Sequence, residues 1–436
     1  MTMVAAASAL GRAEKTVAIS HNSQSHRPSP VSVGFVAPRI AAGIRFRPKA
    51  LAAAIARTIT LRDAPEALLA QWSRSALLEV EVLIANGPAF GLSPTIRSLA
   101  DAERSAFAGR VGAGMADLVM NVLGYRWRDN AACLLGSGPR PDFIYGGGQA
   151  DGHGVVLVEA HGSFAEGVNK ARMEREAKRK YLRQVKPHVG GSCLHGQLVH
   201  GYSTAFGSQP TSKGTFLHVT EKRIPKPTGM PKAHATALTS TERVTPSSLT
   251  LATYRANFLL MGAAKVVAWL DWLRGVREAP PASSISTFFS IEQQGRRFLA
   301  AAEAFFPHLA PDSWIEEFGF PPFRFDYWRG IGPWLADRVV WKDLFVMDED
   351  AAISFLNQLS SLGRNGRDSL PPFRDLPSLE PLGFTLGDEG HADDEDPRYP
   401  LARFRDGLAL LGRVPPSSLG RSPQWRWSPE GGFNAQ

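Results

Sequence analysis

The sequence predicts a central α/β unit flanked by an N-terminal helical segment and an all-α C-terminal domain. Short apolar runs punctuated by glycine and proline lie between residues 125 and 245, and apolar residues at helical spacing lie on both sides of them. At 436 residues the chain is long enough for two or three domains with a large buried core. Its 44% hydrophobic and 21% charged residues exclude a disordered or coiled-coil chain.

The N-terminal part divides into two regions of different pattern. Residues 1–47 show no convincing period and no secretory signal, so we expect a flexible leader there. Residues 48–124 form the helical segment, with helices predicted over 50–59, 64–84 and 99–123. The last of these helices ends at Gly124, a residue suited to the left-handed conformation that follows a helix.

Residues 125–245 carry the pattern of strands interrupted by one charged helix. Strands are predicted over 132–135, 142–145 and 155–160, followed by a helix over 168–186 and strands over 193–202 and 214–223. The glycine-rich turn 146–154 would join the second and third strands as a hairpin. This succession defines the α/β unit.

The C-terminal part of the sequence has apolar residues at helical spacing. Proline-separated helices are predicted over 249–274, 291–306, 327–341 and 351–362, which gives an all-α domain over 246–375. Residues 376–436 hold the acidic run DEGHADDED and a Pro- and Trp-rich end, so an irregular tail is expected.

The cysteine count and the lengths of the apolar runs indicate where in the cell the protein is expected. Cys133 and Cys193 are too few for a disulfide scaffold, which favours a reducing cytoplasm. No segment offers about 20 uninterrupted apolar residues, so we expect neither a transmembrane helix nor a membrane partner.

Two carboxylates in the central unit are the candidate chemical centre. Asp142 begins one predicted strand, and Glu159 lies 17 positions later near the end of the next. Hairpin pairing would bring together two hard oxygen ligands of the kind that Mg²⁺ prefers, and the period of two in a strand puts His161 on the face of Glu159. The alternative is that Asp142 is a turn residue and Glu159 pairs with a lysine of the next helix.

These residues resemble a known family signature. Pro141-Asp142, a hairpin, and then Glu159-Ala160-His161-Gly162-Ser163 are similar to the motif of the PD-(D/E)xK nuclease superfamily, and the order helix, three strands, helix and strand is also similar. The resemblance covers about a quarter of the chain. It implies a restriction-endonuclease-like core in which Asp142 and Glu159 bind Mg²⁺ or Mn²⁺.

This sequence departs from the family pattern at one position. His161 stands where the superfamily has its lysine. Three interpretations are open: His161 coordinates the metal or acts as a base, a lysine of the following helix such as Lys170 or Lys178 takes over the role, or cleavage has been lost.

The helix predicted over 168–186 carries much of the chain's net charge of 49 − 41 = +8. It sets eight basic residues against Glu174 and Glu176, a pattern that predicts sequence-independent binding of nucleic acid, DNA first. A solvated helix face is the alternative. The expected phosphate ligands are Lys170, Arg172, Arg175, Lys178, Arg179 and Arg183.

Four other patterns in the sequence are weaker signals of function. Cys193, His195 and His200 do not have a recurrent zinc spacing. The glycine-rich stretch 109–114 lies inside a helical stripe and predicts close helix packing, while Asp117 is either a supplementary acid or a partner in a surface pair. The aromatic residues of 318–341 could stack on bases, but packing in the core of a helical domain is the favoured interpretation.

The sequence therefore predicts a metal-dependent DNA endonuclease in the cytoplasm. The metal would activate water and offset the charge of the scissile phosphate. By the resemblance alone, host defence or DNA processing would be its setting. The alternatives are a catalytically inactive nuclease-fold module that binds nucleic acid or a protein, and a scaffold subunit that docks a protein partner through its C-terminal helical domain.

Overall fold

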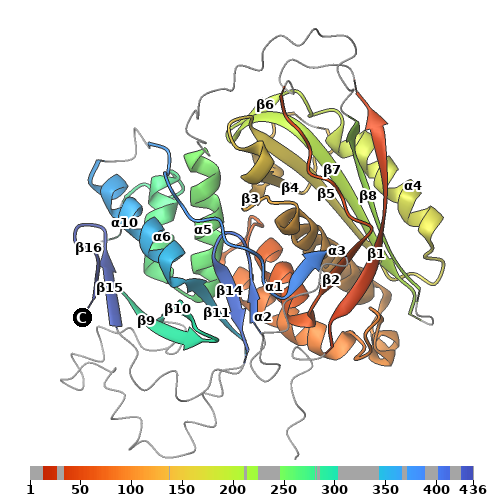
Figure 1. Ribbon diagram of the computed structural model, residues 1–436, viewed down its shortest axis with the longest axis horizontal. Helices are drawn as coiled ribbons and strands as arrows, with labels where there is room; N and C mark the ends of the chain where they lie inside the picture. The colour runs from red at the N-terminus through yellow and green to blue at the C-terminus, as the bar shows by residue number, and fades with distance from the viewer. Residues whose placement is uncertain are drawn as a thin grey trace, which may run out of the picture.

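A computed structural model shows two β-sheets side by side, each with its own helices (Figure 1). One continuous cluster of buried hydrophobic residues extends from the first sheet and its helices into the second. The structure describes residues 13–26, 34–136, 138–210, 214–223, 246–279, 281, 285–302, 343–365, 371–387, 401–412 and 424–435.

The first sheet is mixed and has the strand order β12-β2-β1-β8-β7-β5-β4-β3, with β6 paired to β7. Strands β3, β4 and β5 are antiparallel neighbours, whereas β5 and β7 run parallel, as do β1 and β8. The strand bounds are β1 (Lys15–Ser25), β2 (Gly43–Phe46), β3 (Trp127–Asn130), β4 (Phe143–Gly146), β5 (Val155–Ser163), β6 (Ser192–Cys193), β7 (Gly196–Ser208), β8 (Thr215–Arg223) and β12 (Phe384–Leu386).

Helices cover both faces of this sheet. They are α1 (Pro48–Ile59), α2 (Glu66–Leu83), α3 (Asp101–Val122) and α4 (Lys170–Lys180), and a π-helical turn at Tyr181–Val185 continues α4. Helix α3 crosses β5 so closely that a Cβ on Gly162 would lie 1.7 Å from the Ala108 carbonyl oxygen. Helix α4 packs on the opposite face, where a Cβ on Gly207 would meet Met173. The parallel strands β5 and β7 are thereby buried between two helices, as parallel strands usually are.

The glycine-rich stretch in α3 serves close packing, as its position inside a helical stripe predicted. A Cβ on Gly112 would come within 2.6 Å of the His161 carbonyl oxygen, and one on Gly114 within 2.6 Å of Ile55 in α1. Gly109 has no atom that near, so it plays no such part.

The second sheet is antiparallel throughout, with the order β13-β14-β11-β10-β9-β15-β16. Figure 1 places α5, α6 and α10 beside it. The element bounds are α5 (Ser247–Met261), α6 (Ala264–Leu273), β9 (Ser286–Gln293), β10 (Arg296–Ala301), β11 (Leu344–Asp348), α10 (Glu349–Asn365), β13 (Leu401–Arg403), β14 (Leu408–Leu411), β15 (Gln424–Ser428) and β16 (Gly432–Ala435).

The prediction of an all-α C-terminal domain is therefore wrong. In the described part of the helix expected over 291–306, the chain instead forms the end of β9 and all of β10, a hairpin that turns at Gln294 and Gly295 with φ of 54° and 68°, and residues 303–306 lie outside the described residues. Apolar side chains from both faces of these strands are buried, so the alternation that marks a half-exposed strand is missing. The helices expected over 249–274 and 351–362 are present, the first divided at Gly262, and the one expected over 327–341 lies outside the described residues.

Three further segments differ from expectation. Residues 15–25, assigned to a flexible leader, form β1, where buried Val17 and Ile19 alternate with exposed neighbours. The strand expected over 132–135 is a 3-10 turn at Ala131–Cys133, and the neighbouring strand β3 comes earlier. The tail expected to be irregular supplies β12 to the first sheet and four strands to the second.

Candidate functional site

The β4–β5 hairpin brings Asp142 and Glu159 together, as the strand pattern predicted. Phe143 pairs with Val158, so Asp142, one residue before β4, lies beside Glu159 in β5. The backbone N–H of Ala160 donates a hydrogen bond of 2.9 Å to Oδ2 of Asp142, which fixes the aspartate against the neighbouring strand. The two carboxyl groups lie within hydrogen-bonding reach of each other.

Glu159 is a buried acid held by the helix that covers it. Its side chain is 1% exposed, Nζ of Lys180 lies 2.7 Å from its Oε1, and Nε2 of Gln184 donates to its Oε2 at 3.1 Å. Burial and the nearby charge of Asp142 raise the pKa of Glu159 to about 8, even though Lys180 acts in the opposite direction. Near neutral pH this carboxyl group therefore retains a proton unless further positive charge approaches.

His161 lies two residues further along β5, on the side covered by α4. Its side chain is half-buried. Burial lowers its pKa, Lys180 and Arg179 lower it further, and Glu176 opposes them. A neutral imidazole beside a carboxylate pair can accept a proton or bind a cation, which are the roles proposed for it from the sequence.

The structure brings Lys180, rather than Lys170 or Lys178, to the carboxylate pair. Lys170 and Lys178 are exposed, whereas Lys180 directs its ammonium to Glu159. The sequence pattern could have indicated Lys180. Met173 and Ala177 form the buried stripe of α4, and helical spacing continues that stripe toward Lys180.

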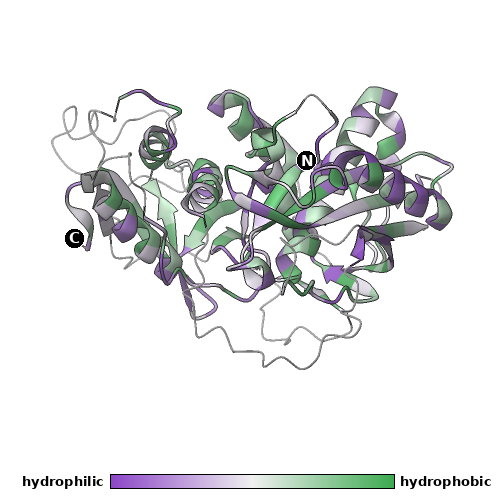
Figure 2. Ribbon diagram, turned by 90° about the horizontal axis from the view of Figure 1, so that it is seen from above, coloured by the Kyte–Doolittle hydropathy of each residue, from purple (hydrophilic) through white to green (hydrophobic). Residues whose placement is uncertain are grey.

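The other basic residues of α4 form an outward face. Arg172 is half-buried, and Arg179 forms an ion pair of 2.6 Å with Glu176. In Figure 2 the right-hand end of the molecule, where Figure 1 places α4, contains much hydrophilic ribbon. The exposed members of this face are Lys170, Arg175, Lys178, Arg179 and Arg183.

A second positive group lies near Asp142. The charge of Arg62, an exposed residue that follows α1, acts on Asp142. Arg110 is held by Glu79 at 2.6 Å. Lys180 is therefore the cation in direct contact with the carboxylate pair, and Arg62 adds a further positive charge in its surroundings.

The donor set fits a hydrated divalent cation. Within the described ranges, no three His, Cys, Asp or Glu side chains gather into a metal-binding group. Mg²⁺ commonly takes only one or two carboxylates and completes its coordination with water and substrate phosphate. Burial and the charge of Asp142 both raise the pKa of Glu159, and a cation between the two carboxyl groups would oppose both effects.

Other candidate residues lie elsewhere. Asp117 is fully buried and bonds to Arg57 at 2.8 Å and to the Tyr145 hydroxyl at 2.9 Å, so it is neither a surface partner nor part of the carboxylate pair. His195 contacts Asp129 and Ser248, whereas His200 contacts Glu221, so the two histidines do not share a centre. The aromatic tract 318–341 lies outside the described residues.

Comparisons with protein-family models, with curated proteins and with solved structures find no match for this chain. In the portion of the chain that the structure describes, no helix combines the length and the apolar character needed to cross a membrane.

Proposed function

We propose that this chain is a metal-dependent phosphodiesterase that cleaves DNA, in the cytoplasm and in host defence or DNA processing. The observation that carries the proposal is the convergence of Asp142 and Glu159 on adjacent antiparallel strands, with Lys180 bound to Glu159. The order of α3, β3, β4, β5, α4 and β7 supports the resemblance to the PD-(D/E)xK superfamily, on which the proposal also rests.

The roles of the residues follow from their contacts. Asp142 and Glu159 would hold Mg²⁺ or Mn²⁺, which when bound neutralises phosphate charge and activates water. Lys180 orients the Glu159 carboxylate and replaces the lysine that the superfamily places at position 161. His161, kept neutral by burial and by the cations around it, accepts a proton at this site.

The outward face of α4 would bind the DNA backbone. Its exposed cations neutralise phosphates without reading bases, so binding weakens steeply with salt. Changing Lys170, Arg175 and Lys178 together to alanine should reduce the salt slope of log K by about 3, at roughly 0.9 per phosphate contact. An unchanged slope would remove α4 from the interface.

Cleavage of plasmid, linear duplex and single-stranded DNA with Mg²⁺, with Mn²⁺ and with EDTA tests the proposal. We expect cutting that requires metal and falls by about 100-fold or more in Asp142→Asn and in Glu159→Gln, since each removes a charged ligand. Glu278→Gln, a change at an exposed acid, is the matched control and should cut normally. Cutting that persists in EDTA or in both site variants would refute the assignment.

Two lysines of α4 allow the role in cleavage to be tested separately from the role in DNA binding. Lys180→Ala should lower the rate of cleavage with little change in DNA affinity, because its ammonium faces Glu159. Lys178→Ala should weaken binding at low salt and leave the rate at saturating DNA unchanged, because its side chain is exposed. The same loss of rate in both variants would contradict the assignment of Lys180.

A second candidate function is a nucleic-acid-binding module without cleavage. Histidine at position 161 and the engagement of Glu159 by Lys180 and Gln184 favour it. Salt-sensitive DNA binding with no cutting in either metal would establish this alternative. The scaffold alternative stays a hypothesis, because its aromatic tract lies outside the described residues, although the C-terminal domain that it assumed to be all-α contains a strand-rich sheet.

A further inference from the structure

The only two cysteines of the chain meet in the folded protein, although 60 residues separate them. Cys133 ends the 3-10 turn after β3, and Cys193 ends β6 just before β7. The Cys133 and Cys193 side chains interact directly, and both residues are half-buried. Nothing in the proposed cleavage reaction uses this pair.

The surroundings of the two sulfurs differ. The backbone N–H of His195 donates to the Cys193 sulfur at 3.4 Å, and the backbone of Gly196 also donates to it. Together with the Cys133 thiol and the nearby His195 ring, these donors lower the pKa of Cys193 to about 6, against the effect of burial. The hydrogen bond to Cys193, burial and Asp129 raise the pKa of Cys133. Cys193 is therefore the more acidic sulfur of the pair, and it has the larger thiolate fraction near pH 7.

We propose that Cys133 and Cys193 form a redox-modification site at which a peroxide converts the two thiols into an intramolecular disulfide. The Cys193 sulfur attacks one peroxide oxygen, the O–O bond breaks, and the departing hydroxide takes a proton to leave as water. The Cys133 sulfur then attacks the resulting sulfenic acid, the S–S bond forms, the S–O bond breaks, and a second water leaves. Two thiols are oxidised and one peroxide is reduced.

The bond would constrain the segment that carries Asp142. The backbone N–H of Ala131, two residues before Cys133, donates to the Asp142 carbonyl at 3.2 Å, and Arg140 donates to the Ala132 carbonyl. Oxidation therefore acts on the turn from which Asp142 enters the candidate site. Only this effect on cleavage rests on the proposed function, and the modification itself does not.

Intact-mass measurement of the reduced full chain after exposure to hydrogen peroxide tests the proposal. We expect the loss of two hydrogens, a crosslink between the two cysteine peptides in non-reducing maps, and full reversal by dithiothreitol. Internal crosslinking should persist at low protein concentration. Intermolecular dimers, or sulfinic and sulfonic acids in place of the internal link, would overturn it.

Two serine variants test the assigned order of reaction. Cys133→Ser should leave a sulfenic acid on Cys193 that dimedone traps, since no second thiol resolves it. Cys193→Ser should react with peroxide at least about 10-fold more slowly at pH 7, because the remaining thiol is protonated. Equal rates for the two variants would refute the assignment of Cys193 as the attacking sulfur. None of these readouts needs DNA or metal, so they stand apart from the test of cleavage.

Discussion

Glu159 shows how one residue's surroundings set its chemistry. An exposed glutamate titrates near 4.5, whereas in this site burial and Asp142 raise the pKa to about 8. Between these two values the folded protein retains a proton that the unfolded chain has released. The folded state thus binds more protons in this window, so stability must fall as the pH rises through it.

Glu159→Gln should remove this penalty. In EDTA, wild type and variant should unfold at similar denaturant concentrations near pH 4.5, while at pH 8.5 the variant should be more stable by about 2 kcal/mol or more, on the scale of 1.4 kcal/mol per pKa unit. Urea unfolding across this range measures the difference. Glu278→Gln should track the wild type at every pH, and parallel curves for Glu159→Gln and wild type would contradict the raised pKa.

The candidate carboxylates could be predicted from the sequence because strand pairing alone brings them together. Pro141 and the glycine-rich turn define a hairpin, and the register follows from its apolar runs. Lys180 was missed as the partner of Glu159, because choosing among the many basic residues of α4 requires the rotation of the helix about its axis. The Cys133–Cys193 contact depends on how β6 returns to β3, which no local pattern reveals.

At the scale of elements, local pattern predicts those that have a clear apolar stripe or run. Helices α1, α2 and α3 and strand β5 lie within a few residues of their predicted bounds, because glycine or proline marks at least one end of each. Strands β9 and β10 bury both faces and were taken for a helix. Strand β1 was missed because its second half, HNSQS, is polar and gains its place by pairing with β8.

Two glycines on one turn of α3 should respond in opposite ways to alanine. Gly112→Ala pushes a methyl group into the β5 backbone at His161, so stability should fall by about 1 to 3 kcal/mol. Gly109→Ala meets open space and should gain about 0.5 to 1 kcal/mol from helix propensity. Chemical unfolding of both variants measures the contrast, and a stable Gly112→Ala would show that α3 and β5 are not closely packed.

At the scale of the whole molecule, a buried charge network joins the two sheets. Asp406, between β13 and β14, accepts hydrogen bonds from Arg57 at 2.9 Å, from Arg128 at 2.6 Å and from Asn257 at 3.0 Å. All four side chains are fully buried. Arg57 belongs to α1 and Arg128 to β3, so this one carboxylate of the second sheet pairs with two guanidiniums that belong with the first, one of which, Arg57, also pairs with Asp117.

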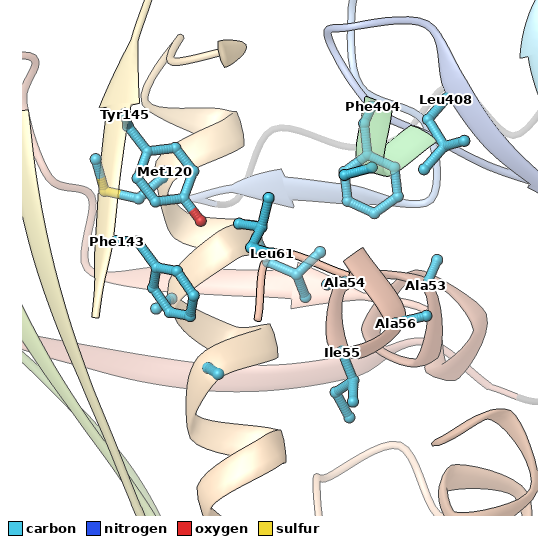
Figure 3. Packing of buried hydrophobic residues seen from close by; sticks show 14 of the residues in the cluster. Ala53, Ala54, Ile55, Ala56, Leu61, Met120, Phe143, Tyr145, Phe404 and Leu408 are labelled. Carbon is cyan, nitrogen blue, oxygen red and sulfur yellow. The ribbon is translucent and has the colours of Figure 1, made fainter. Parts of the chain in front are cut away.

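Apolar contacts surround this network. Figure 3 shows Phe404 and Leu408 beside Leu61 and the alanines of α1, and the Arg57 guanidinium lies 3.9 Å from the centre of the Phe404 ring. The same figure shows Tyr145 and Met120, from β4 and α3, on the other side. The junction is therefore packed as a core.

Asp406→Ala should destabilise the protein by about 3 to 5 kcal/mol, because it removes the carboxylate that pairs with the buried Arg128 guanidinium and leaves Arg57 with Asp117 alone. Glu380→Gln is the control, because Glu380 is 80% exposed in its pair with Arg405 and its loss should cost less than about 1 kcal/mol. Thermal unfolding followed by circular dichroism compares the two. Comparable losses in the two variants would argue against the network as the joint between the sheets.

Strand β12 makes the stability of the first sheet depend on the C-terminal part of the chain. It follows α10 and precedes β13 along the chain, yet it pairs with β2 at the edge of the first sheet. A truncation that removed residues after 376 would therefore remove β12 from the edge of the first sheet. It would also remove Asp406, the buried carboxylate that pairs with Arg57 and Arg128. The halves should melt in one cooperative transition, and a nonsense mutation late in the gene should abolish the function of residues encoded more than two hundred codons earlier.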